Sequence, residues 1–596
     1  MKVPRSGAAG AYRPEVDGLR AIAVLAVMLF HAGVPWVPGG YLGVDIFFVI
    51  SGYLIMRVIV AEREAGHFSL ARFWIRRIRR ILPALLLTMA LATPFAVLWM
   101  LPDQLQNFGQ SLTASALMGN NVLLWLTDGY WSEPAQFKPL LHTWSLGVEE
   151  QFYLLLPPIM LLLLRGGQRV LATGLALLAL ASFVLAHCWA AIDEQVAFLL
   201  LPSRIWQLLA GALVALAPQS SGRSWISWGA LAAMISAILL FDEGDAAVPA
   251  LVILPILGCM MFLWAGTAGT SAGRLLAWRP FVAIGLVSYS AYLFHYPVFA
   301  FIRLLSWREP SPLVLLASVP AILLAAWASW RWVEVPARDA QRLGNGVLLA
   351  LCAVVGLALA GTGYALHRSA GLADRWPELA GAGDTGDYVD APLRFEDIAL
   401  DPGLREANLL VVGNSMARDA INMALESAAV DPGRLTYQRA QGCDAGAIAA
   451  SVQRAAQVDT VIIATSVGIG QAACHLRWAQ ALERAGVTHV VVLAPKQFGW
   501  SLNPALRLSS EHRAALRVAP LDPWPAIARE LERALPQDSF LDPLGQVADS
   551  RGRVPLFTPD GLLVTQDRRH LTPAGAKWLG EQLFATPQLR HLRDHS

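Results

Sequence analysis

A serine, an aspartate and a histidine in the last third of the chain have the residue types and the setting of a catalytic triad. Ser415 follows the short apolar run 408–413 and Asn414, and a helical pattern begins directly after it. A serine at a strand-to-helix turn presents its hydroxyl group at the edge of a sheet, where it can act as a nucleophile. The spacing Asp567-x-x-His570 lets a carboxylate orient an imidazole that activates the serine. The plainer alternative is a turn serine and an aspartate that caps a helix.

Ionisable side chains also lie inside apolar runs in the first half of the chain. Such groups are costly in a membrane, so each is a candidate functional residue. They are the histidines His31 and His295 and the carboxylates Asp45, Glu149 and Glu150. A histidine near a carboxylate can act as a general base with a set tautomer. The alternative for any one of them is an interfacial or hydrogen-bonded core side chain.

A third group of candidate residues is a stretch of arginines. They recur at helical spacing, so several of them share one face of a helix. A guanidinium group pairs with phosphate through two hydrogen bonds, which makes this face suitable for a phosphate-bearing ligand. The alternative is an anchor that contacts anionic lipid headgroups. The stretch contains Arg72, Arg76, Arg77, Arg79 and Arg80.

The composition indicates which elements must position these residues. The chain has 596 residues, of which 55% are hydrophobic and 15% charged. An average soluble domain has about 25% charged residues, so an ordinary cytosolic enzyme, a disordered protein and a secreted disulfide-rich peptide are excluded. The net charge of +2, without a basic patch interleaved with aromatic residues, gives no reason to expect nucleic-acid binding.

Apolar runs long enough to cross a bilayer, about 20 residues each, predict a polytopic α-helical membrane domain of about eleven transmembrane helices. Lys and Arg of the short loops concentrate on one side, which predicts a cytoplasmic N-terminus and an outward C-terminal domain. Residues 112–126 are expected to form a re-entrant or interfacial helix rather than a span. The runs are centred near Leu25, Val49, Leu91, Leu155, Leu178, Leu209, Ala233, Leu257, Leu293, Leu323 and Val355.

The C-terminal part alternates β-branched runs with helical patterns, which predicts an α/β/α domain with a mostly parallel sheet. The expected strands are 408–413, 459–465 and 489–494, and the expected helices are 416–428 and 471–486. Two cysteines of this outward domain, Cys443 and Cys474, are expected to form a disulfide in an oxidising compartment. Two unpaired buried thiols are the alternative.

The first part resembles the membrane acyltransferase-3 family, which transfers acyl groups, often acetyl, onto surface glycans. The ordered set of segments that carries the resemblance comprises Asp17–Arg20, His31, Asp45–Tyr53, Arg72–Pro83, His142–Tyr153, Ser203–Trp206, Tyr289–Pro297 and Glu334–Pro336. The resemblance implies that the arginine stretch, together with Arg13, meets the phosphates of a cytoplasmic acyl-CoA. It also implies that His31 lies at the transfer centre, oriented by Asp45 or Glu149. Ser51, Tyr53, Glu150 and His295 would support this centre.

The last part, about 405–590, resembles the SGNH hydrolase superfamily, which has a flavodoxin-like fold. Ser415, Asp567 and His570 match its catalytic positions. Asn414 stands where that superfamily often has aspartate, and Gly442 matches its oxyanion glycine. The oxyanion asparagine has no clear match in the region 465–468. The resemblance therefore implies an oxyanion hole that is incomplete or built from backbone N–H groups.

Together these features predict an O-acyltransferase of the bacterial inner membrane that uses acetyl-CoA or another acyl-CoA as donor and no metal. The acceptor would be a hydroxyl group of O-antigen, exopolysaccharide, peptidoglycan or a small glycolipid. Whether the acyl group passes through Ser415 is open. A membrane-anchored esterase or deacetylase and a polytopic transporter are the alternatives. The expected domains are 1–343 (acyltransferase-3), 344–366 (a linking transmembrane helix), 367–404 (a linker) and 405–596 (SGNH-like).

Overall fold

The chain folds into two compact units. The computed structural model describes residues 12–127, 134–218, 220, 222–242, 249–379, 385–401, 403, 408–465 and 467–594. The helical unit consists of residues up to Leu98, Asn107–Arg303 and Pro310–Arg368. The α/β unit consists of Ser369 onward together with two short segments, Trp99–Gln106 and Leu304–Glu309.

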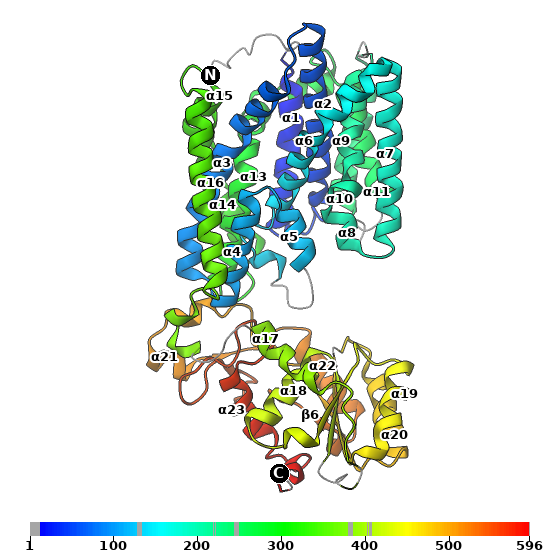
Figure 1. Cartoon of the computed structure of the whole chain (residues 1–596), viewed down its shortest axis with the longest axis vertical. Coiled ribbons are helices and arrows are strands. Elements are labelled where there is room, and N and C mark those ends of the chain that lie inside the picture. The colour runs from blue at the N-terminus through cyan, green and yellow to red at the C-terminus, as the bar shows by residue number, and fades with distance from the viewer. Residues whose placement is uncertain are drawn as a thin grey trace. The chain divides into compact units, whose positions relative to one another are not determined.

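The helical unit is a bundle whose long helices lie side by side (Figure 1). Every predicted apolar run forms a helix, and in the described residues eight helical stretches are long and apolar enough to cross a membrane. The protein is therefore a multi-pass membrane protein, while the number eleven stays a prediction because three of the helices are shorter or carry more charge. The helices are α1 (Pro14–His31), α2 (Gly43–Glu64), α3 (Leu70–Trp99), α4 (Pro102–Ala116), α5 (Asn120–Thr127), α6 (Thr143–Leu163), α7 (Gln168–Ala190), α8 (Glu194–Leu199), α9 (Leu201–Leu216), α10 (Ser224–Leu240), α11 (Pro249–Ala265), α12 (Ser271–Leu276), α13 (Arg279–Leu304), α14 (Pro312–Ser329), α15 (Val335–Arg338) and α16 (Asn345–Arg368).

The region 112–126 is divided between two short helices. α4 has 15 residues and α5 has 8, both below the length of about 20 that a span needs. The chain breaks between them at Met118, whose backbone is left-handed with φ 56°. This interruption agrees with the expected non-spanning segment.

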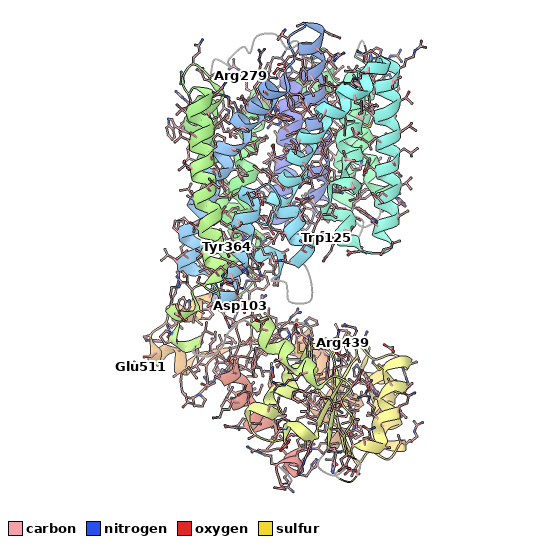
Figure 2. The ribbon with its side chains drawn as sticks, in the orientation of Figure 1. Asp103, Trp125, Arg279, Tyr364, Arg439 and Glu511 are labelled. Atoms are coloured by element: carbon pink, nitrogen blue, oxygen red, sulfur yellow. A yellow bond between two sulfur atoms is a disulfide. The ribbon has the colours of Figure 1, made fainter. Side chains whose placement is uncertain are left out.

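The outer surface of the helical unit is apolar. Trp125 of α5 and Tyr364 of α16 are 37% and 61% exposed, and both are labelled in Figure 2. Only 22% of the apolar window of α16 is buried inside the protein. A surface of this kind is suited to contact with lipid tails.

Glycines let α2 and α9 approach each other closely. A Cβ on Gly52 would lie 1.7 Å from the carbonyl oxygen of Leu208, and a Cβ on Gly211 would lie 1.9 Å from that of Val49. Small residues at helix contacts are typical of membrane proteins, where close backbone packing replaces the hydrophobic effect. This contact holds the helix of Asp45 and Ser51 against the helix of Arg204.

The α/β unit has a five-stranded parallel sheet in the order β2-β1-β3-β4-β6. The strands are β1 (Leu409–Gly413), β2 (Leu435–Arg439), β3 (Thr460–Ala464), β4 (His489–Leu493) and β6 (Phe540–Leu541), and β5 (Arg517–Val518) pairs with β7 (Val554–Pro555) separately. Three of these strands were predicted. β2 was not predicted because its sequence is not an apolar run, and β6 was not predicted because it has only two residues.

Helices cover both faces of this sheet, as Figure 1 shows. One core cluster takes side chains from α18 (Ser415–Glu426) and α23 (Pro573–Leu583). The other takes side chains from α20 (Ala472–Arg484) and α22 (Trp524–Ala534), with α19 (Ala445–Arg454) packed at its edge. The expected three-layer α/β/α arrangement is therefore observed.

The segment 367–404 differs from a free linker. In its described part, Val389 is fully buried and Phe395 is 6% exposed. Glu396 forms a parallel bridge with Tyr437 of β2, and the compact unit begins at Ser369 rather than at 405. Apolar side chains between the Gly, Asp and Pro residues of this segment pack against the α/β unit. The composition of the segment did not indicate this packing.

We expect Gly52→Ala to destabilise the protein by about 1–3 kcal/mol, the usual cost of overpacking, because the added methyl group meets the α9 backbone. Gly229→Ala is the matched control, since a Cβ on Gly229 of α10 meets nothing within 4 Å. Thermal unfolding of the detergent-solubilised protein measures both. Equal melting temperatures for the two variants would contradict the close α2–α9 contact.

Candidate functional site

Ser415 stands at a sharp turn between β1 and α18. The turn uses Gly413, whose φ of 148° is unfavourable for other residues, and a Cβ there would lie 1.9 Å from the carbonyl oxygen of Ala464. Asn414 caps α18 through a hydrogen bond from the Met416 N–H to its side-chain oxygen, 3.1 Å long. Asn414 is therefore the N-cap residue of α18, and Ser415 is the first residue of the helix.

The structure brings Ser415, His570 and Asp567 together. Ser415 Oγ lies 2.8 Å from His570 Nε2, and His570 Nδ1 lies 2.5 Å from Asp567 Oδ2. A carboxylate only accepts, so Nδ1 carries the proton and Nε2 is the acceptor for the serine hydroxyl group. Both Ser415 and His570 are buried. This is the hydrogen-bond geometry of an activated serine nucleophile.

The environment keeps Asp567 ionised. Burial acts to raise its pKa, but the nearby His570 and the hydrogen bonds that the carboxylate accepts lower the pKa well below its usual value. These bonds include the backbone N–H groups of His570 at 2.7 Å and Arg569 at 2.9 Å. The carboxylate is therefore held in one orientation and remains an anion throughout the physiological pH range.

A buried ion pair supports the triad from behind. Asp419 lies one helical turn after Ser415 and pairs with Lys496, which follows β4; both side chains are almost fully buried. Asp419 also accepts the N–H of Leu571, next to His570, at 3.4 Å. The pair links the serine helix to the histidine loop. Sequence inspection missed it, because a lone Asp on a helix and a lone Lys after a strand carry no motif.

The region of the expected oxyanion hole is only partly described. Gly442 lies in the loop after β2, and a Cβ there would meet nothing within 4 Å. Thr465 Oγ1 lies 2.8 Å from His475 Nε2, and Ser466 lies outside the described residues. Cys443 and Cys474 form a disulfide with a Cα–Cα distance of 6.1 Å. The disulfide attaches the Gly442 loop to α20.

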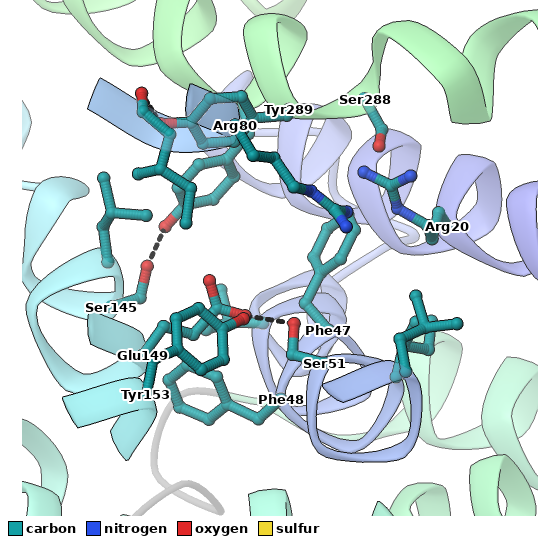
Figure 3. A pocket seen from close by; sticks show the side chains of 16 residues that line it. Arg20, Phe47, Phe48, Ser51, Arg80, Ser145, Glu149, Tyr153, Ser288 and Tyr289 are labelled. Atoms are coloured by element: carbon teal, nitrogen blue, oxygen red, sulfur yellow. Dashed lines mark hydrogen bonds between the residues drawn. The ribbon is translucent and has the colours of Figure 1, made fainter. Parts of the chain in front are cut away.

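A pocket in the helical unit collects charged and hydroxyl side chains from α1, α2, α3, α6 and α13 (Figure 3). Its volume, with its open side included, is about 700 Å³. Figure 3 shows the guanidinium groups of Arg20 and Arg80 directed into the space that Glu149 also faces. Ser51 donates a hydrogen bond to Glu149, and Tyr153 and Tyr289 complete the polar lining. We call this the membrane pocket.

The arginines expected to bind acyl-CoA fall into two groups. In the first group the guanidinium groups donate their hydrogen bonds to other residues of the helical unit. Arg79 is buried and donates to the carbonyl oxygens of Ala337 and Leu343, each at 2.6 Å, and to Asn345. Arg13 donates to Tyr53 and to the carbonyl oxygens of Leu263 and Gly266, and pairs with Glu15. The predicted phosphate contact is therefore wrong for Arg79 and Arg13, whose guanidinium groups tie helices together.

The second group retains capacity for a ligand. Arg80 makes no hydrogen bond with the described residues and lines the membrane pocket. Arg77 lies over the ring of Phe73 at 5.8 Å. Arg72 is exposed at the start of α3, and Arg76 pairs with Glu62 at 2.8 Å. Adjacent arginines differ in this way because successive residues of a helix point about 100° apart.

His31 has a histidine partner instead of the expected carboxylate. His31 Nδ1 lies 3.0 Å from His295 Nε2, and His295 Nδ1 lies 2.7 Å from the carbonyl oxygen of Tyr292. A carbonyl oxygen only accepts, so in the neutral rings His295 Nδ1 and then His31 Nδ1 carry the protons. The remaining nitrogen, His31 Nε2, holds a lone pair and can act as a base.

The carboxylates expected to orient His31 have other partners. Asp45 pairs with Arg204 at 3.0 Å and accepts from Gln207 at 2.7 Å. Glu149 accepts from Ser51 in the membrane pocket, and Glu150 beside it interacts with the charges of Arg77 and Arg80. The expectation that Asp45 or Glu149 orients His31 is therefore wrong, because each is closer to a donor on a neighbouring helix.

Comparisons with known proteins identify the family of the helical unit. The sequence profile described as an acyltransferase domain, that of the acyltransferase-3 family, matches residues 13–331. The chain belongs to the acyltransferase-3 family. The match includes His31, His295 and the whole membrane pocket, whereas the α/β unit from Ser369 onward lies beyond it.

Two curated proteins with similar sequences are named O-acetyltransferases. The chain is 30% identical over 351 residues to the peptidoglycan O-acetyltransferase OatA of Listeria monocytogenes, which covers 55% of this chain and 56% of the relative. It is 29% identical over 347 residues to the O-acetyltransferase OatA of Staphylococcus aureus, covering 55% and 57%. The chain thus spans little more than half of the length of these relatives. No solved structure matches.

Several residues of the membrane pocket and its surroundings were not named as site residues from the sequence, although they lie in segments that carry the family resemblance. Arg20 and Ser145 line the membrane pocket, and Tyr292 supplies the carbonyl group that sets the tautomer of His295. The charge of Arg20 inside an apolar run was a usable signal, whereas a backbone carbonyl group leaves none. In the described residues no three His, Cys, Asp or Glu side chains could hold a metal ion.

We expect Asp567→Asn to lower turnover at Ser415 by about 10⁴-fold, because an amide cannot stabilise the imidazolium ion or hold the correct tautomer. Hydrolysis of p-nitrophenyl acetate by the full-length protein measures this. Asp549→Asn is a matched control, since Asp549 also accepts backbone N–H groups, of Arg551 and Arg553, but contacts no histidine. Similar rates for the two variants would refute the triad.

We expect His295→Ala to lower acyl transfer to the glycan by about 10²-fold, the lower end of what a positioned base contributes, because His31 loses the acceptor that fixes its tautomer. His295→Gln, which can still accept from His31, should recover part of the rate. Transfer from labelled acetyl-CoA in membranes is the measurement. Full activity of His295→Ala would show that the contact between the two rings is incidental.

Proposed function

We propose that the protein is an O-acyltransferase that takes an acyl group from cytoplasmic acyl-CoA, carries it across the inner membrane and places it on a glycan hydroxyl group. Acetyl is the first candidate acyl group. Family membership and relatives named O-acetyltransferases support this proposal. The observation that carries it is a complete Ser415–His570–Asp567 triad on the same chain as an acyltransferase-3 helical unit.

On the donor side, Arg80 and Arg20 would attract an anionic donor to the membrane pocket, with Arg72, Arg76 and Arg77 nearer the exposed start of α3. Arg20 is paired with Asp17, whereas the guanidinium group of Arg80 has no ion-pair partner among the described residues and would be costly in a membrane domain unless a ligand uses it. His31 Nε2 would remove the proton from the attacking group or carry the acyl group for a time. The distribution of Lys and Arg among the short loops supports a cytoplasmic entry for the donor.

On the acceptor side, the α/β unit would act as an SGNH-like transferase through an acyl-enzyme. Ser415 Oγ attacks the acyl carbonyl carbon while His570 Nε2 takes its proton, and the departing donor group recovers that proton. The sugar hydroxyl group then attacks the Ser415 ester and gives its proton to His570. His570 returns the proton to Ser415 Oγ as the acylated sugar leaves. The same triad with water as acceptor would be an esterase, but an anchored esterase has no need for a membrane pocket lined by Arg20, Arg80 and Glu149.

Membranes that contain the full-length protein, incubated with labelled acetyl-CoA and the host's own glycans, test the proposal. We expect label on the glycan with the wild-type protein, and at least a 10²-fold loss in both His31→Ala and Ser415→Ala, the general size of a lost base or nucleophile. In His31→Ala, label should also be missing from Ser415.

The other outcomes are equally informative. Unchanged glycan label in Ser415→Ala would remove the relay through the serine and leave direct transfer from the helical unit. Loss of previously attached acetyl groups instead of their addition would identify a deacetylase. Absence of glycan label from the wild-type protein would refute the transferase as proposed.

A further inference from the structure

A large groove in the α/β unit lies beside β6, the edge strand of the parallel sheet. It has a volume of about 1670 Å³ with its open side included. Its lining includes Pro495 after β4, Leu541 and Asp542 at the end of β6, and residues of α22. The carboxyl ends of parallel strands are the usual place for ligands in such sheets. The groove extends to Asp542 at the carboxyl end of β6, and β1, which leads into Ser415, ends on the same side of the sheet with β3 and β4 between them. We call it the Trp524 groove.

The side chains of the Trp524 groove combine an aromatic ring with hydrogen-bonding groups. Trp524 at the start of α22 is partly exposed, and Glu532 and Gln546 reach the groove from α22 and the loop after β6. Asp542 is held in place by the Leu544 N–H, which donates to its Oδ1 at 3.0 Å. An indole ring offers a flat apolar face with one polar edge, while carboxylates and amides bind hydroxyl groups. This combination suits a sugar chain better than a lipid tail.

The Trp524 groove also reaches the triad. The guanidinium group of Arg569 lies over the Trp524 ring at 5.5 Å from its centre. The backbone N–H of the same Arg569 donates to Asp567 Oδ1 at 2.9 Å. One residue therefore contacts both Trp524 and the carboxylate that orients His570, which connects the groove to the triad loop.

We propose that the Trp524 groove binds the acceptor glycan and delivers its hydroxyl group to the Ser415 acyl-enzyme. This rests on the proposed function and adds the acceptor site to it. Trp524 stacks on the apolar face of a sugar ring, and Asp542 accepts hydrogen bonds from sugar hydroxyl groups. The groove contains both acidic and basic side chains, Glu532 and Arg529 among them, so it selects by hydroxyl groups and ring shape rather than by net charge.

The variants Trp524→Ala and Asp542→Asn, each in the full-length protein, test this proposal with two readouts. The first is labelled acetyl transfer to the host's glycans in membranes. The second is acetylation of Ser415 by p-nitrophenyl acetate, a donor that needs no acceptor site. Trp524→Phe keeps an aromatic face, and Asp560→Asn, on an exposed loop outside the groove, is the control for loss of a carboxylate.

We expect Trp524→Ala to lower glycan labelling about tenfold, the size of a lost aromatic contact, with Ser415 acetylation at the wild-type rate. Trp524→Phe should restore most of the loss, and Asp560→Asn should have no effect. Unchanged glycan labelling in the Trp524→Ala/Asp542→Asn double variant would overturn the proposal. Equal loss of both readouts would also overturn it, because the groove would then serve the triad itself.

Failure of this proposal is distinguishable from failure of the proposed function. If Ser415→Ala leaves glycan labelling intact, the relay through the serine fails, whatever the groove variants do. If Ser415→Ala abolishes labelling while the groove variants have no effect, only the acceptor site fails.

Discussion

A charged side chain inside a membrane domain needs a partner, because neither lipid nor close-packed protein can replace its hydration water. In the helical unit this need divides the buried charges into two classes. Arg79 and Asp45 are satisfied by neighbouring helices, so they hold the bundle together. Arg80, Arg20 and Glu149 face a common pocket instead. Arg20 also pairs with Asp17 and Glu149 accepts from Ser51, so the pocket holds charges that are only partly engaged by the fold.

Buried charges in the α/β unit also need partners, and there the partners lie in the same unit and hold the triad in place. Asp567 accepts hydrogen bonds from its own loop and from the His570 ring, so its charge is stabilised locally and the ring is held toward Ser415. Behind it, Asp419 and Lys496 neutralise each other and join the serine helix to the histidine loop. Removing one member of such a pair would leave a buried charge alone, so both residues are needed to keep the serine helix and the histidine loop joined.

Much of this molecule could be anticipated from local patterns. The apolar runs form helices where they were expected, and Ser415, Asp567 and His570 lie within hydrogen-bond distance although 155 residues separate the serine from the histidine. A run of apolar residues and a strand–turn–helix carry their signal in a few consecutive positions. The partner of His31 carried no such signal, because His295 lies 264 residues away and Asp45 is a more conventional candidate. The internal hydrogen bonds of Arg79 were equally hidden, since they go to two backbone carbonyl groups and to the Asn345 side chain, more than 250 residues away.

The order of the residues was enough to predict a multi-pass membrane part, an α/β part and the serine, histidine and aspartate that come together in the latter. Each of these features depends on a pattern of apolar and polar residues within one helix or one strand–turn–helix segment. It could therefore be predicted without knowing which distant residues are in contact. The three-dimensional structure was needed to assign each buried charge, to pair His31 with His295 and to reveal the Trp524 groove. These features depend on which helix or loop packs beside which, and that is decided by the shape of many side chains and glycines together.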